Sequence, residues 1–123
     1  MKFHLSTESS DRMTGVRRVE STANAAVKLI AGLRMKKNRD EAGLFIAEGA
    51  RTALEGLERG IAPRYLLYTS HAAERDAVQR LRDACLRVGG TCLETNEAVI
   101  TKVTRKDNPQ AVVAAFPIQV GTL

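Results

Sequence analysis

Cysteine, histidine and tryptophan are scarce in this sequence, which limits the ways in which the chain can be stabilised. Its 123 residues include two cysteines, two histidines and no tryptophan. Cys85 and Cys92 are too few for a disulfide scaffold. His4 and His71 show no ligand spacing with the cysteines, so we predict no metal site. A chain of this length buries about two-thirds of the surface that it exposes when unfolded, so it needs neither a disulfide nor a metal ion for stability.

The sequence also lacks the signatures of membrane proteins and of common enzymes. No apolar run approaches the roughly 18 residues of a membrane-spanning helix, and the polar N-terminal segment has no signal-peptide core. We therefore expect a cytoplasmic protein that has no membrane partner. There is no Walker loop, no dinucleotide-binding glycine pattern and no spacing that suggests a catalytic triad. We predict no catalytic residue and no cofactor-binding residue in this chain.

Aromatic residues make up 4% of the chain, so the stacking of bases on aromatic rings would be limited. Phe45, Tyr65 and Phe116 fall in apolar runs, and we expect them in the core. The charge balance is basic, with 19 Lys and Arg against 14 Asp and Glu, a net charge of +5. This charge favours an anionic partner, although many basic domains bind none.

The first 20 residues differ from the remainder of the chain. They are rich in serine, threonine and charge and show no sustained hydrophobic period. We predict a flexible tail over residues 1–20. The alternative is an RNA-contacting arm that uses Arg12, Arg17 and Arg18.

Helical and strand patterns alternate from residue 21 onward. Apolar residues at helical spacing predict helices that begin near residues 21, 49, 70 and 96. Short apolar runs predict strands at residues 44–47, 65–68, 91–94 and 110–116. This alternation predicts an α/β fold, a three-layer α/β/α sandwich around a small, mostly parallel sheet. We assign residues 21–118 to one domain and residues 119–123 to an exit segment.

The segment from residue 34 to residue 51 combines positive charge with a core strand. It reads RMKKNRDEAGLFIAEGAR, and four cations stand close together at its start: Arg34, Lys36, Lys37 and Arg39. Next to the end of a core strand, they would have a rigid support that suits phosphate recognition. A simpler interpretation is that Arg34, Lys36 and Lys37 fall in the last turn of the first helix or just beyond it, where cations interact well with the carbonyl end of the helix dipole. The roles of Glu48 stay open: pairing with Arg39 or Arg51, accepting bonds from RNA, or fixing the turn before the next helix.

Two sequence blocks carry a family resemblance. The first reads KKNR followed by GLFIAEGAR, and the second, from residue 107 to residue 114, reads DNPQAVVA. In this order, the blocks resemble the substrate-binding domain of SpoU/TrmH-type RNA 2′-O-ribose methyltransferases of the SPOUT superfamily. The resemblance covers roughly residues 24–117. One departure is Ala111, where the family has glycine, because alanine resists the positive φ that glycine permits.

The resemblance implies a fold similar to that of ribosomal proteins and kink-turn binders, and a structured RNA partner, above all ribosomal RNA. In the family, a catalytic domain that binds S-adenosylmethionine follows. The resemblance therefore makes residues 119–123 the start of a linker, makes that catalytic domain a partner, and is compatible with a homodimer formed through it. With the neighbouring cations included, the candidate RNA-binding residues are Arg34, Lys36, Lys37, Arg39, Glu48, Arg51, Arg105, Lys106, Asn108 and Gln110.

Two other functions stay open at this point. The chain could be a free-standing RNA-binding protein of the ribosomal or kink-turn type, with no enzymatic role. It could also be a protein-interaction module whose basic edge serves solubility alone. On the leading hypothesis, the 123 residues recognise RNA and do not methylate it, because the methyl-donor site belongs to the family's catalytic domain.

Overall fold

A single five-stranded sheet organises the computed structural model, which describes residues 15–106 and 110–119. The strands are β1 (Val16–Arg18), β2 (Leu44–Glu48), β3 (Tyr65–Thr69), β4 (Thr91–Thr95) and β5 (Val112–Pro117). They lie in the order β1-β4-β3-β5-β2. The pairs β1–β4 and β3–β4 are parallel, whereas β3–β5 and β2–β5 are antiparallel. The sheet is therefore mixed, but β1, β2, β3 and β4 all run in one direction and β5 runs against them, so the prediction of a mostly parallel sheet is confirmed.

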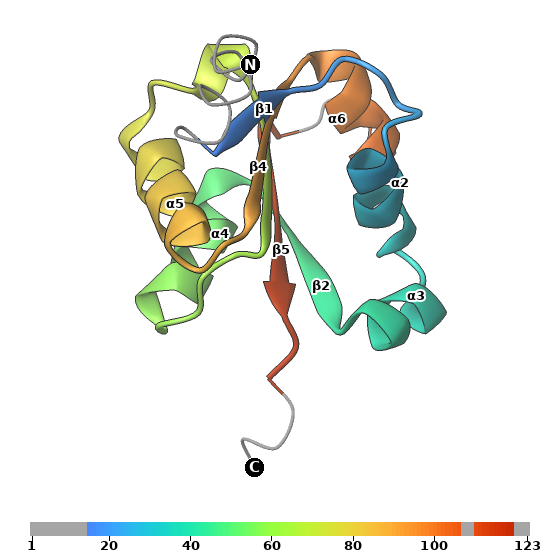
Figure 1. Ribbon diagram of the computed structural model, residues 1–123, viewed down its shortest axis with the longest axis horizontal. Helices are drawn as coiled ribbons and strands as arrows, with labels where there is room; N and C mark the ends of the chain where they lie inside the picture. The colour runs from blue at the N-terminus through green and yellow to red at the C-terminus, as the bar shows by residue number, and fades with distance from the viewer. Residues whose placement is uncertain (1–14, 107–109, 120–123) are drawn as a thin grey trace, which may run out of the picture.

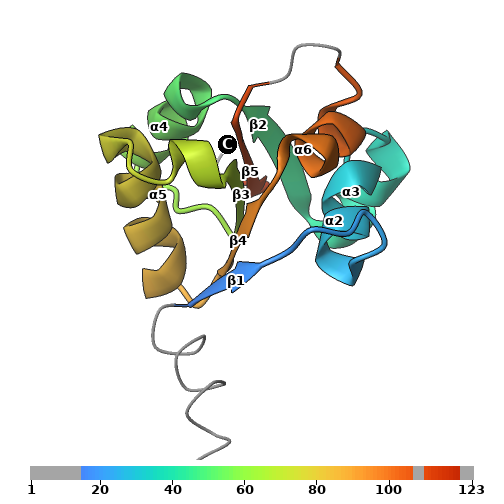
Figure 2. The ribbon, with the colours of Figure 1, turned by 90° about the horizontal axis from the view of Figure 1, so that it is seen from above.

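The helices cover both faces of this sheet, so the α/β class and the three layers are confirmed. In Figures 1 and 2, α4 (Ala50–Glu58) and α5 (Asp76–Arg87) lie on one side of the sheet. On the other side lie α2 (Ala25–Gly32), α3 (Lys36–Ala42) and α6 (Glu97–Thr104). A 3₁₀ turn, η1 (Ser70–Ala72), follows β3.

The course of α6 explains why β5 runs against its neighbours. Asn96 caps the start of α6 just after β4 ends, with its Oδ1 accepting from the Val99 amide at 3.0 Å. Lys106, just after α6, contacts Glu48 at the end of β2. Both ends of α6 therefore lie at the edge of the sheet where β2, β3 and β4 have their carboxyl ends. The chain starts β5 from that end and must run antiparallel to β3.

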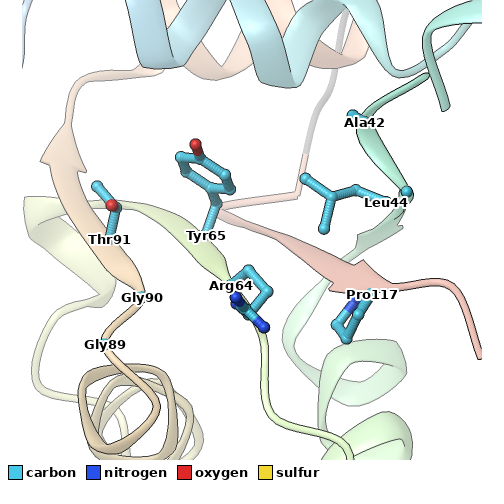
Figure 3. Close-up of a pocket in the computed structure, with 9 residues that line it drawn as sticks. Ala42, Leu44, Arg64, Tyr65, Gly89, Gly90, Thr91 and Pro117 are labelled. Atoms are coloured by element: carbon cyan, nitrogen blue, oxygen red, sulfur yellow. The ribbon is translucent and has the colours of Figure 1, made fainter.

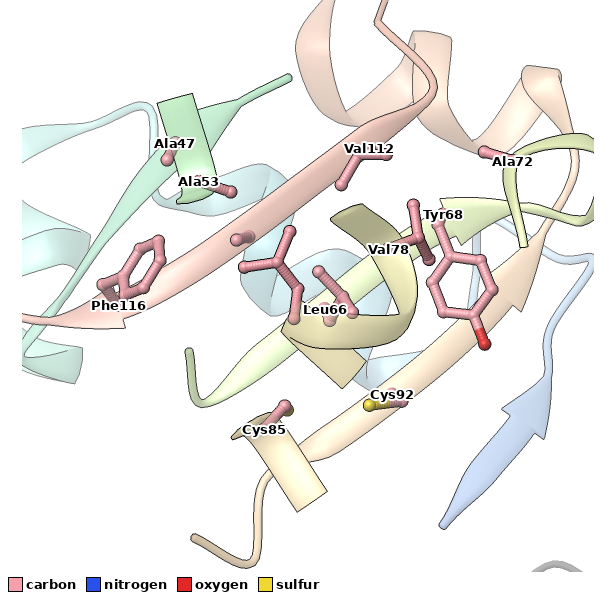
Figure 4. Packing of buried hydrophobic residues seen from close by; sticks show 12 residues of the cluster. Ala47, Ala53, Leu66, Tyr68, Ala72, Val78, Cys85, Cys92, Val112 and Phe116 are labelled. Carbon is pink, nitrogen blue, oxygen red and sulfur yellow. The ribbon is translucent and has the colours of Figure 1, made fainter. Parts of the chain in front are cut away.

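Alternating side chains of the strands divide the core between the two faces. Leu66 and Tyr68 pack under α4 and α5, whereas Leu67 faces α2 and α6. Figure 4 shows the first of these clusters, in which Phe116 is 1% exposed. The ring of Phe45 stacks on Phe116, with 5.9 Å between the centroids, but Phe45 itself is 38% exposed. The prediction of a core position is therefore confirmed for Phe116 and wrong for Phe45.

The segment predicted as a tail contributes a strand to the sheet. Strand β1 pairs in parallel with β4, and Val19, which follows it, is buried. The Val19 amide donates to the Glu94 carbonyl at 2.9 Å, and the Thr95 hydroxyl donates to the Val19 carbonyl at 2.5 Å. The tail prediction was wrong for these residues, because a three-residue strand is too short to show a period. Arg12 lies outside the described residues.

The two cysteines occupy the core. Cys85 on α5 and Cys92 on β4 are both fully buried and lie in the same cluster in Figure 4. A hydrogen bond with Cys85 and burial both raise the pKa of Cys92 above its usual range. Because the thiolate is the reactive form, both burial and the raised pKa protect Cys92 from reagents.

We predict that thiol labelling of the native protein at pH 8 is slow and follows unfolding. A maleimide or aromatic disulfide reagent should label the folded chain at least about a hundredfold more slowly than the urea-unfolded chain, because labelling requires opening of the core. The measurement compares the two rates by mass spectrometry. Rapid labelling of either cysteine in the folded protein would contradict the core assignment.

Candidate nucleic-acid interface

The basic segment folds differently from its prediction. The first helix ends at Gly32, and a second helix, α3, starts at Lys36 and includes Lys37 and Arg39. Lys36 and Lys37 therefore do not lie in the last turn of the first helix, and they begin a separate helix just beyond it. A helix break is hard to see in the sequence here, because no proline marks it and glycine is the sole signal.

Side chains from α3 complete the carboxyl end of α2. Arg39 donates from Nη1 to the Leu33 carbonyl at 3.1 Å and to the Arg34 carbonyl at 2.8 Å. Asn38 donates from Nδ2 to the Gly32 carbonyl at 2.9 Å. These carbonyls lack partners within the helix, and the partial negative charge at the carboxyl end of α2 also favours a cation. Arg39, to which the helix-dipole interpretation did not extend, thus caps the end of α2 from a different helix.

The other cations of this segment are more exposed. Arg34 donates from Nε to the Ala31 carbonyl at 3.2 Å, and Lys36 forms an ion pair with Asp40 at 2.7 Å. Lys37 is exposed and makes no hydrogen bond or ion pair with any residue that the structure describes. The segment therefore offers fewer free charges than its composition suggests.

Strand β2 separates the predicted RNA-binding residues into two groups. Helix α3 leads into Leu44, whereas Glu48 and α4 follow at the other end, four residue steps of about 3.3 Å away, or roughly 13 Å. Figure 1 shows α3 and α6 at opposite ends of the same layer. Next to the start of β2 lie Arg34, Lys36, Lys37 and Arg39; at its end or beyond lie Glu48, Arg51, Arg105, Lys106 and Gln110. Asn108 lies outside the described residues.

We call the second group the carboxyl-end surface: Glu48, Arg51, Arg105, Lys106 and Gln110. Its centre is an ion pair in which the Lys106 ammonium contacts Glu48 Oε1 at 2.5 Å. The Glu48 side chain is 22% exposed, against 58% for Lys106. Of the partners foreseen for Glu48, Arg39 is excluded, because its guanidinium caps α2 instead. Sequence spacing could not predict Lys106 as the partner of Glu48, because the two residues are 58 positions apart in the chain.

Backbone geometry fixes this surface at two points. Gly49 has a φ of +95°, and its amide donates to the Val112 carbonyl at 2.7 Å. A Cβ at this position would lie 3.3 Å from Cγ of Gln110, so the side chain of Gln110 covers the glycine. Arg105 has a φ of +58°, and its amide donates to the Thr101 carbonyl at 2.6 Å. The left-handed conformation ends α6 and starts the loop toward β5.

Helix α4 presents its amino end at the carboxyl-end surface. Gly49, the residue before the helix, supplies no side-chain cap, and the first turn contains no acidic residue. The first amides of the helix therefore keep their partial positive charge, and Arg51 adds a full charge on an exposed side chain. This combination suits an anion such as a phosphate group.

Arg18 also reaches this end of the sheet, which the tail prediction did not reveal. Its guanidinium contacts the Ser70 hydroxyl, pairs with Glu20 at 3.1 Å and lies 3.5 Å from Glu94. Two carboxylates thus share its charge, and it offers less to an anion than Lys106 or Arg51. Among the described residues, no group of histidine, cysteine and acidic side chains could hold a metal ion.

Comparison with known proteins assigns a family. Residues 24–114 match the model of the MRM3-like substrate-binding domain. The chain belongs to this family. The rRNA methyltransferase from Sinorhizobium meliloti is 37% identical, with a TM-score of 0.75 over 85% of this chain and 38% of that one. An RNA 2′-O ribose methyltransferase is 32% identical, with a TM-score of 0.70 over 87% and 40% of the two chains.

A more distant likeness concerns the fold alone. The SpoU methyltransferase AviRb from Streptomyces viridochromogenes is 23% identical, with a TM-score of 0.64 over 81% of this chain and 37% of that one. This substrate-binding domain thus spans well under half the length of these relatives. No curated protein sequence matches the chain. Within the described residues, no helix is long and apolar enough to cross a membrane.

We predict that Arg39→Ala lowers the free energy of unfolding by about 1–2 kcal/mol, because two carbonyls just beyond the end of α2 lose a charged donor. Lys37→Ala is the matched control in the same helix, and it should change stability by less than about 0.5 kcal/mol. Urea unfolding followed by circular dichroism measures both values. Equal effects of the two substitutions would show that Arg39 has no capping role.

Proposed function

We propose that this substrate-binding domain recognises structured RNA, ribosomal RNA in the first instance, through its carboxyl-end surface. One observation carries the proposal: Arg51, Lys106 and the uncapped amino end of α4 lie at the same end of the sheet. The support from the comparisons is the family description and the relatives named rRNA methyltransferase and RNA 2′-O ribose methyltransferase.

The chemistry of this surface favours recognition of phosphates and shape. Arg51 and Lys106 can neutralise phosphates, and Arg51 can hold one with two parallel bonds. Glu48 keeps Lys106 in place before RNA arrives, and its second oxygen can accept a bond from a ribose hydroxyl or a base amino group. None of the surface residues is aromatic, so base stacking contributes little here.

A larger enzyme is the proposed setting of this domain. One solved relative is described as an AdoMet-bound rRNA methyltransferase. By this analogy, a catalytic domain would bind S-adenosylmethionine and act on RNA that this domain delivers. We further propose that two copies of the enzyme form a homodimer through their catalytic domains and that the enzyme works in the cytoplasm. Residues 119–123 would begin the connection to it. The second candidate, a free-standing RNA-binding protein, uses the same carboxyl-end surface and differs in needing no catalytic partner.

The proposal predicts a marked salt dependence of RNA binding. If about three cations contact phosphates, log affinity should fall with log salt at a slope of roughly −2 to −3. Arg51→Ala and Lys106→Ala should each weaken binding about tenfold, as loss of a charge-assisted contact implies. Arg80→Ala, on the exposed face of α5, is the control and should leave affinity unchanged.

Titration of a fragment of ribosomal RNA at several salt concentrations gives both the slope and the affinities. A slope near zero would contradict recognition by charge. If Arg34→Ala and Lys37→Ala weaken binding while Arg51→Ala and Lys106→Ala do not, the RNA binds at the opposite end of the sheet.

We also predict that the isolated chain binds no S-adenosylmethionine and transfers no methyl group. A methyl donor needs a shaped pocket with several converging polar groups, and the analogy with the relatives places the donor outside this domain. Calorimetry with the donor, in the absence and in the presence of RNA, is the measurement. Saturable binding of S-adenosylmethionine by the 123-residue chain would show that its role is not limited to binding the substrate.

A further inference from the structure

A hollow opens at the end of the sheet opposite the carboxyl-end surface. Its volume is about 330 Å³, and it lies among the starts of β2, β3 and β4 and the end of β5. Figure 3 shows Arg64, Tyr65 and Thr91 at this hollow, with Leu44 and Pro117 on the side of β2 and β5. We call it the amino-end hollow.

The backbone around the hollow is held in place. The Arg64 amide donates to the Ala115 carbonyl at 2.8 Å, and the Thr91 amide donates to the Arg64 carbonyl at 2.9 Å. The Gly90 amide donates to the Cys85 carbonyl at 2.8 Å. A Cβ on Gly90 would lie 2.7 Å from the Arg64 carbonyl oxygen, so glycine is required for this close packing. The walls are therefore rigid before any ligand binds.

Three side chains at the hollow have donors to spare. The guanidinium of Arg64 and the hydroxyls of Tyr65 and Thr91 make no hydrogen bond or ion pair with any described residue. Arg64 is exposed, and Tyr65 and Thr91 are half-buried. A rigid wall that carries unused donors is the arrangement of a binding site for a polar ligand.

Charge at the hollow is mixed, which narrows the class of ligand. Arg64 supplies a positive charge, but Ala42 brings the carboxyl end of α3, with its partial negative charge, to the same hollow. A bare phosphate would be attracted by Arg64 and repelled by the carboxyl end of α3. A nucleotide suits both charges, because its phosphate can pair with the Arg64 guanidinium while amino groups of its base donate to the carbonyls at the end of α3. The volume is at the lower end for small-molecule sites and would not admit a duplex.

We propose that the amino-end hollow binds one unpaired nucleotide of the RNA, with Arg64 on its phosphate and Tyr65 and Thr91 on its base or ribose. This inference rests on the proposed function, since it takes the ligand to be RNA. Unpaired nucleotides in RNA are usually recognised through their exposed edges by such polar and aromatic side chains. Arg64 and Tyr65 thereby become specificity residues outside the family blocks that run from residue 36 to residue 51 and from residue 107 to residue 114.

The position of the hollow next to the chain exit supports this role. The Ile118 amide donates to the Gly43 carbonyl at 2.9 Å, so the chain leaves β5 against the wall of the hollow. In longer relatives such as the AdoMet-bound rRNA methyltransferase, this domain accounts for 38% of the chain. A nucleotide in the hollow would therefore lie beside the segment that follows β5. A single RNA could then contact both ends of the sheet.

Nuclear magnetic resonance titration with the four 5′-nucleoside monophosphates tests the proposal. We expect saturable shifts of the Gly43, Gly89, Gly90 and Thr91 amides with at least one nucleotide, and no such shifts with inorganic phosphate. Arg64→Gln should weaken this binding about tenfold, and Tyr65→Phe should weaken it less. Arg80→Gln is the control. Both variants at the hollow retain the backbone bonds that form its walls.

The absence of nucleotide-dependent shifts at these amides would overturn the proposal, and so would an unchanged affinity in Arg64→Gln. The affinity for the ribosomal RNA fragment separates this failure from that of the proposed function. If Arg51→Ala and Lys106→Ala weaken RNA binding but the hollow takes no nucleotide, the carboxyl-end surface stands and the hollow fails. If nucleotides shift the hollow while Arg51→Ala and Lys106→Ala bind RNA normally, the carboxyl-end surface fails.

Discussion

Strand β5 is the element on which the sheet depends, because its backbone pairs with β3 on one side and β2 on the other. Without it, β2 would have no partner in the sheet. Its residues from Val112 to Phe116 are buried, and Phe116 fills the space under α4. Because β5 starts at the carboxyl end of β2, it brings Gln110 against Gly49 and keeps Lys106 near Glu48. The geometry of the proposed RNA-binding surface is thus a consequence of strand pairing.

The cations of this domain differ in the contacts that they make. Arg39 stabilises the fold, since it supplies donors to carbonyls at the end of α2. Lys106 and Arg51 are exposed, and their positions beside the amino end of α4 suit the electrostatic role toward RNA that we propose for them. The net charge of +5 does not distinguish these uses. Only the partners of each guanidinium or ammonium group separate a structural cation from a binding cation.

Local patterns predicted much of the fold. Alternating apolar runs predicted the order of the strands and of every helix after residue 21 except α3, and the predicted start of the last helix near residue 96 agrees with the cap that Asn96 forms on α6. The sequence could not reveal β1, because three residues carry no measurable period. It also did not predict α3 as a separate helix. Gly32 was too weak a signal for the break, and the contacts of Asn38 and Arg39 that stabilise it are tertiary.

The sequence by itself determined the fold class, the family and the types of side chain available to the proposed RNA-binding surface. It placed the two family blocks in order but treated their cations as one site, because neighbours in sequence were taken as neighbours in space. The tertiary structure decided which cations lie together. Strand β2 holds Lys37 and Arg51 at opposite ends, whereas α6 brings Lys106 to Glu48 from far along the chain. An extended strand separates residues by about 3.3 Å per step, and only chain topology returns distant residues to the same end.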